Sequence, residues 1–117
     1  NETGRKNVKS GIDKQRLRAG NFVSNNGRVL RTINILRHQY NKLSGIQNVL
    51  EENGVTEDEF LDAVNFLALE GYIHLREVSS KHDASLADKK YQVLEAKLTG
   101  KGIRLLAGGI EDNMIEV

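Results

Sequence analysis

Apolar residues recur at helical spacing in the first half of the chain. Between residues 27 and 41 they fall on one side of a predicted helix, and basic residues fall on the other. The apolar side consists of Val29, Leu30, Ile33, Leu36 and Tyr40. Because asparagine is a common N-cap residue, Asn25 or Asn26 is expected to begin this helix.

A second, shorter helix is predicted after Leu43. Ser44 is its expected cap, and Gly54 follows its end, where glycine tolerates a left-handed backbone conformation. Its apolar side comprises Ile46, Val49 and Leu50.

The strongest helix start signal in the chain comes next. Thr56 and Glu59 have the spacing of a capping box, in which each side chain satisfies a backbone amide of the other residue. The helix predicted here covers Glu57–Glu70, and Gly71 is expected to terminate it. Its buried stripe is expected to contain Phe60, Leu61, Val64, Leu67 and Ala68.

The periodicity then changes from helical spacing to alternation. Residues 72–78 and 91–98 each alternate as a strand, and the polar residues 79–90 between them predict a long hairpin. The inward positions of the two strands are Ile73, Leu75, Leu94, Ala96 and Leu98.

Thr99 is the expected cap of a last helix, which ends at Gly108. In this helix Ile103 and Leu106 are expected to join Leu98 in the core and to seal the inner face of the sheet. The pattern predicts an α+β fold in three parts: a basic flexible arm (1–24), a folded domain (25–108) and an acidic C-terminal tail (109–117).

Two stretches resemble the winged-helix superfamily. One is "GVTEDEFLDAVNFLALEGYI" (residues 54–73), and the other is "LTGKGIRLL" (residues 98–106), which is similar to an L-T-x-K-G-x-x-L-L ending. Together they look most like small YjcQ-type winged-helix proteins of Gram-positive bacteria and their phages. The resemblance covers residues 27–107 and implies a three-helix core, a two-stranded β-hairpin wing and a C-terminal helix. It also implies a DNA-binding regulator of phage or mobile-element type.

Charge is distributed unevenly along the 117 residues, although the net charge is only +1. Residues 1–42 hold ten basic and two acidic residues, and the rest of the chain is acidic. The arm and the first helix therefore supply candidate phosphate contacts, and the wing supplies more. The candidates for nucleic-acid binding are Lys14, Arg16, Arg18, Arg28, Arg31, Arg76, Lys81, Lys89 and Lys90. A solvated basic arm and a solvated hairpin tip are the simpler interpretations of the same charges.

The third predicted helix departs from the usual pattern of a DNA-reading helix, because it has five acidic residues and no lysine or arginine. Its outer side predicts a protein contact instead, through either a partner or a second copy. The candidate partner-binding residues are Asp58, Asp62, Asn65, Phe66 and Leu69. In the simpler alternative, Phe66 and Leu69 only cover the first helix or the arm.

Catalysis is not expected. The chain has no cysteine, and its three histidines lack the spacing of metal ligands. No phosphate-binding loop frame occurs, so neither a metal nor another cofactor is predicted. No apolar run approaches the length of a membrane span, and a cytoplasmic protein without a membrane partner is expected. The sequence thus predicts a winged-helix protein that binds DNA mainly through its arm and wing. The alternative is a protein-interaction module that uses the acidic third helix.

Overall fold

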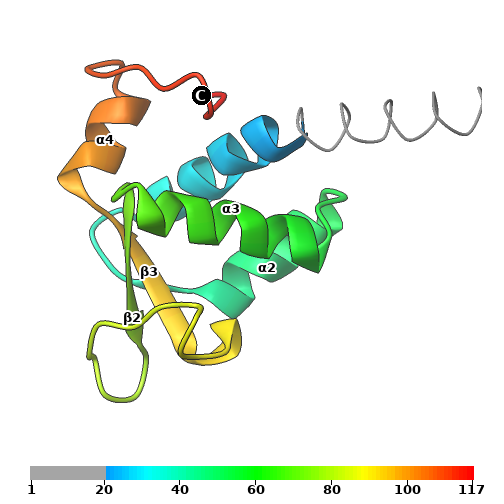
Figure 1. Ribbon diagram of the computed structural model, residues 1–117, viewed down its shortest axis with the longest axis vertical. Helices are drawn as coiled ribbons and strands as arrows, with labels where there is room; N and C mark the ends of the chain where they lie inside the picture. The colour runs from blue at the N-terminus through cyan, green and yellow to red at the C-terminus, as the bar shows by residue number, and fades with distance from the viewer. Residues whose placement is uncertain (1–20) are drawn as a thin grey trace, which may run out of the picture.

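The structure is a computed structural model that describes residues 21–117. In this part of the chain, four helices and a three-stranded antiparallel sheet form an α+β fold, compatible with a winged-helix-like layout (Figure 1). The first of these helices covers residues 21–34. The elements that follow are β1 (Asn41–Lys42), α2 (Leu43–Glu52), α3 (Glu57–Leu69), β2 (Ile73–Glu77), a 3₁₀ turn η1 (Tyr91–Val93), β3 (Leu94–Leu98) and α4 (Gly100–Leu106).

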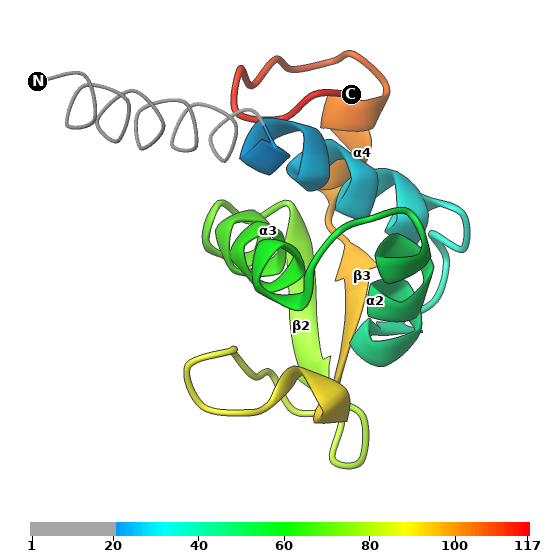
Figure 2. The same cartoon turned by 90° about the vertical axis from the view of Figure 1, so that its right-hand side faces the viewer.

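The core lies between the helices and one face of the sheet. Helices α2 and α3 cover this face, and helix 21–34 packs above them (Figure 2). The predicted inward positions of β2 and β3 are all buried, which confirms the alternation. In α3, Phe60, Val64 and Leu67 are fully buried as expected, while Leu61 and Ala68 are only partly buried.

The predicted capping box at the start of α3 is confirmed. The Glu59 amide donates to Oγ1 of Thr56 at 3.2 Å, and the Thr56 amide donates to Oε1 of Glu59 at 3.2 Å. The backbone hydrogen bond from Thr56 holds the pKa of Glu59 below its usual value of 4.5. A local signal therefore fixes where α3 begins, with an N-cap that stabilises the helix by about 1 kcal/mol.

The first helix was predicted to begin and to end too late. It already includes residues 21–24, so the predicted arm boundary at residue 24 falls inside it, and it ends at residue 34. Leu36 is consequently 52 % exposed rather than buried. The chain leaves the helix because residues 41 and 42 pair with β3, and the Asn41 side chain donates to the carbonyl of Leu36 at 3.3 Å.

The sheet has the order β1-β3-β2, and β1 was not predicted. Asn41 pairs with Ala96 and Lys42 pairs with Glu95. The second predicted strand is shorter than expected, because residues 91–93 form η1 and pairing with β2 begins at Leu94.

Helix α2 differs from its prediction in cap and phase. It begins at Leu43 with Lys42 at the N-cap, and no side-chain hydrogen bond caps it, so Ser44 does not have the predicted role. Val49 is 46 % exposed, and Gln47 is buried on the same helix instead. The buried side-chain amide of Gln47 has a hydrogen-bond partner within the same helix, because its Nε2 donates to Oε2 of Glu51 at 3.1 Å.

The junction between β3 and α4 forms around Thr99, as predicted. Its Oγ1 accepts from the Gly102 amide at 3.1 Å and donates to the carbonyl of Gly71 at 2.6 Å. The buried side of α4 differs from the predicted one, because Leu105 is fully buried whereas Ile103 and Leu106 are only partly buried. Leu98 is buried as predicted.

The residues after α4 pack against helix 21–34 (Figure 1). Asn26, which was predicted as a cap, is buried inside the helix and donates to the carbonyl of Met114 at 2.9 Å. The Glu116 amide donates to the carbonyl of Val23 at 3.1 Å, and Ile115 is buried. A Cβ atom at Gly27 would lie 1.7 Å from the Glu116 carbonyl oxygen, so only glycine permits this approach.

A second contact holds the same C-terminal segment. The Tyr72 hydroxyl donates to Oδ2 of Asp112 at 2.5 Å. Burial, assisted by the charge of Asp112, raises the pKa of Tyr72 to about 12. The predicted acidic tail is therefore part of the folded domain.

Candidate functional site

The outer face of the sheet, opposite the core, carries mainly charged side chains. The strand register brings them into two rows: His74 pairs with Lys97, and Arg76 pairs with Glu95, which also pairs with Lys42 of β1. Directly paired residues point to the same face of an antiparallel sheet. Because the inward positions are apolar, these alternate positions form the outer face.

Glu95 orients two cations on this face. Nε of Arg76 donates to Oε2 of Glu95 at 2.6 Å, and Nζ of Lys81 lies 3.4 Å from the same oxygen. Burial alone would raise the pKa of Glu95, but the two cations outweigh it and the pKa lies below 4.5. Glu95 is therefore ionised at neutral pH and fixes the Arg76 side chain.

Tyr40 lies over the same face. The guanidinium carbon of Arg76 is 3.4 Å from the centroid of the Tyr40 ring, and Nζ of Lys97 is 6.0 Å from it. The Tyr40 hydroxyl is 2.6 Å from Nδ1 of His74, whose Nε2 is 2.7 Å from Oδ1 of Asp83. With its proton on Nε2, His74 accepts from Tyr40 and donates to Asp83.

The outer face has an excess of positive charge. It holds four cations (Lys42, Arg76, Lys81 and Lys97) and two carboxylates (Glu95 and Asp83). Arginine and lysine in fixed positions suit the oxygens of a phosphate group. Sequence reasoning found Arg76 and Lys81 but missed Lys42, Lys97, Tyr40 and His74. The signal that could have found Lys97 is its alternation with the inward residues Ala96 and Leu98.

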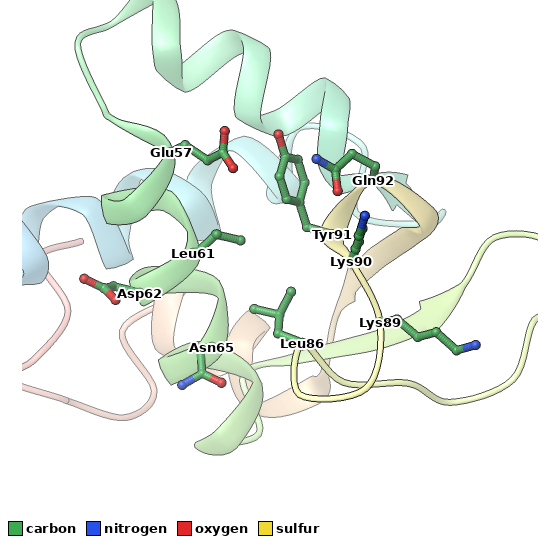
Figure 3. Close-up of a pocket in the computed structure, with 9 residues that line it drawn as sticks. All are labelled: Glu57, Leu61, Asp62, Asn65, Leu86, Lys89, Lys90, Tyr91 and Gln92. Atoms are coloured by element: carbon green, nitrogen blue, oxygen red, sulfur yellow. The ribbon is translucent and has the colours of Figure 1, made fainter.

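The other two predicted wing cations lie elsewhere, beside α3. Lys89 and Lys90 belong to a loop that faces this helix across an open groove of about 540 Å³ (Figure 3). Lys89 points away from the groove, and its Nζ lies 3.4 Å from Oε2 of Glu77. A hydrogen bond with Ser80 and the charge of Lys89 hold the pKa of Glu77 below its usual value.

The α3 groove, as we name this hollow, has an apolar floor and polar walls. Leu61 of α3 faces Leu86 of the loop and Tyr91 of η1, and the amides of Asn65 and Gln92 lie at the sides of the groove. The full lining comprises Glu57, Leu61, Asp62, Asn65, Leu86, Lys89, Lys90, Tyr91 and Gln92.

The remaining predicted cations do not join either surface. Arg28 and Arg31 line a separate hollow with Ile35 and Val49, and Nη1 of Arg31 donates to the carbonyl of Glu116 at 2.8 Å. Lys14, Arg16 and Arg18 lie outside the described residues. The described members of the predicted nucleic-acid set are thus divided among three places.

The predicted partner-binding residues of α3 are also divided. Asp62 and Asn65 line the α3 groove, and Asp58 is exposed. Phe66 is partly buried and its ring packs edge-on against Phe22, with 5.2 Å between centroids, so the simpler interpretation holds for this residue. Leu69 is 78 % exposed.

Other kinds of site find no counterpart in residues 21–117. Over this range, no group of three or more His, Asp or Glu side chains could hold a metal ion. None of the helices there is long and apolar enough to cross a bilayer. Comparison of the chain with protein-family models, curated proteins and solved structures gave no match.

Proposed function

We propose that this protein binds nucleic acid through phosphate contacts on the outer face of its sheet. The observation that carries the proposal is the fixed position of Arg76, which donates to Glu95 and stacks on the ring of Tyr40. Lys97 and Lys42 extend the positive surface across β3 and β1. Neutralising phosphates with such cations releases counterions, which is a large part of nucleic-acid affinity.

The proposal places the contacts away from α3, which would be the recognition helix in an ordinary winged-helix protein. The exposed residues of α3 include Glu57, Asp58 and Asp62 and no cation. Carboxylates beside a phosphate backbone repel it. We therefore infer a winged-helix fold whose sheet and hairpin, rather than α3, contact the phosphates.

Sequence readout by this face is expected to be weak. Base edges are read mainly by arginine, lysine, asparagine and glutamine in a groove. Nε of Arg76 is occupied by Glu95, and the rest of the face presents lysines, which act as point charges. A regulator of phage or mobile-element type with this surface would take its position largely from phosphate contacts.

A titration with fluorescently labelled duplex DNA tests the proposal. Fluorescence anisotropy at several salt concentrations gives the slope of log K against log salt, which is about −0.9 for each phosphate neutralised. We expect measurable binding at low salt and a slope corresponding to a few contacts. An absence of binding at low salt contradicts the proposal.

A further inference from the structure

The hollow between helix 21–34 and α2 is a surface that the nucleic-acid proposal leaves unused. It has a volume of about 470 Å³, and its apolar part consists of Ile35, which directly follows the helix, and Val49 and Leu50 of α2. Ile35 is 76 % exposed and Val49 is 46 % exposed, whereas Leu50 is buried. Exposed apolar side chains that are grouped around a hollow, rather than scattered singly, mark a site of protein contact. We name this place the α2 hollow.

Two cations lie on one side of the α2 hollow. Arg28 and Arg31 line it from the first helix, and both are exposed. Nη1 of Arg31 donates to the carbonyl of Glu116 at 2.8 Å, and Nη1 of Arg28 lies 3.5 Å from Oδ1 of Asn25. Both arginines are thus bonded to uncharged oxygens. Within residues 21–117 neither has a carboxylate partner, so their charges are not neutralised in this part of the chain.

An acidic residue lies on the other side of the hollow. Glu52 follows Val49 by three positions, which places both on the same side of α2, and it adjoins the lining residue Asn53. Glu52 is exposed, and over the described range it takes part in no ion pair. The hollow therefore separates cations on the first helix from an acid on α2.

A surface with this arrangement is complementary to a second copy of itself. In a two-fold symmetric contact the same patch is used by both protomers, and each pair of contacts forms twice. Helix 21–34 of one protomer would face α2 of the other, which brings Ile35 against Val49 and the two arginines against Glu52. One copy thus supplies both the protruding apolar side chain and the hollow that accepts it, and the charges at the rim are opposite in sign.

We propose that this protein forms a two-fold symmetric dimer through the α2 hollow. The contact is small, since its exposed apolar area comes from Ile35 and Val49, and interfaces below about 1,200 Å² belong to transient complexes. The dimer therefore forms at high protein concentration and dissociates on dilution. The outer face of the sheet takes no part in the contact, so this inference does not depend on nucleic-acid binding.

Sedimentation velocity of the full chain tests the dimer, in a series from about 10 µM to about 1 mM that covers weak association. We expect the sedimentation coefficient of the wild type to rise from that of a monomer toward that of a dimer. Ile35→Asp places a charge in the apolar contact and should remain monomeric throughout. Leu69→Asp is the matched control, because Leu69 is 78 % exposed on α3, outside the hollow, and it should behave as the wild type. A wild type that stays monomeric, or an Ile35→Asp variant that still dimerises, overturns the proposal.

An exchange of charges tests the pairing of the first helix with α2 of the other copy. Arg28→Glu/Arg31→Glu and Glu52→Arg each place like charges opposite one another in both halves of a symmetric contact, so each alone should be monomeric at low salt. In an equimolar mixture, a mixed dimer has opposite charges in both halves, and dimer should reappear. Circular dichroism checks that the variants are folded, since Arg31 also holds the Glu116 carbonyl. A mixture of folded variants that remains monomeric contradicts this pairing and with it the proposed dimer.

Discussion

Arg76 donates from Nε to Oε2 of Glu95 at 2.6 Å, across directly paired positions of β2 and β3. Glu95 is 5 % exposed although it lies on the outer face, because Arg76 and Lys81 cover it. The guanidinium of Arg76 also stacks on the ring of Tyr40, with its central carbon 3.4 Å from the ring centroid. One buried carboxylate therefore sets the geometry of the cationic face.

Glu95 should contribute stability that depends on pH. Its folded-state pKa is lowered, so its contribution is present above its ordinary value of 4.5 and is lost as the pH falls through the lower folded value. Glu95→Gln should lower Tm at pH 7, and the difference from wild type should shrink below pH 4.5. Thermal melts between pH 7 and pH 3 measure this, with exposed Glu52→Gln as the control. A Tm difference that stays constant over this range contradicts the assignment.

Gly27 should be sensitive to substitution, because it lies against the C-terminal segment. Gly27→Ala forces a Cβ atom against the Glu116 carbonyl oxygen, and overpacking of this kind typically costs about 1–3 kcal/mol. Gly45→Ala in α2 is the matched control, since no atom lies within 4 Å of its Cβ position. The control should gain up to about 1 kcal/mol from helix propensity. Urea unfolding measures both, and stabilisation by Gly27→Ala is incompatible with the packed C-terminal segment.

Thr99 should stabilise the β3–α4 junction through its hydroxyl. Thr99→Ala removes the cap on Gly102 and the bond to the Gly71 carbonyl, at a cost of about 1 kcal/mol or more. Thr99→Ser keeps both bonds and should retain most of the stability. Chemical denaturation of the two variants distinguishes them, and equal loss in both shows that the methyl group matters rather than the hydroxyl.

Elements with strong local signals were predictable from the sequence. The capping box fixed the start of α3, and Gly54 adopts the expected positive φ angle of 85°. Gly71, which was predicted to terminate α3, has a φ angle of 78°. Thr99 was identified in the same way. Elements that depend on distant partners were not predictable. The two-residue strand β1 exists only because β3 pairs with it, and this pairing also ends the first helix before Leu36.

The candidate site was predictable only in part. Alternation placed Arg76 on a strand, but nothing local indicated that Glu95 would pair with it or that the ring of Tyr40 would stack on its guanidinium. Both contacts join segments that are far apart in the chain, and Arg76 and Glu95 are separated by 19 positions. From charge alone, Lys81 and Lys89 were predicted to be available for phosphate contacts. The fold instead places each of them beside a carboxylate.

The location of the phosphate contacts is the central claim, and two double variants of equal charge test it. Lys42→Gln/Lys97→Gln removes two cations from the outer face of the sheet, and Lys89→Gln/Lys90→Gln removes two from the loop beside α3.

The deciding measurement is the salt dependence of duplex DNA binding by wild type and both variants. We predict that the outer-face variant binds more weakly and that its salt slope falls by about one for each phosphate that is no longer neutralised. The loop variant should keep nearly the wild-type slope. A slope that falls in the loop variant and is unchanged in the outer-face variant would place the phosphates beside α3 and contradict the account.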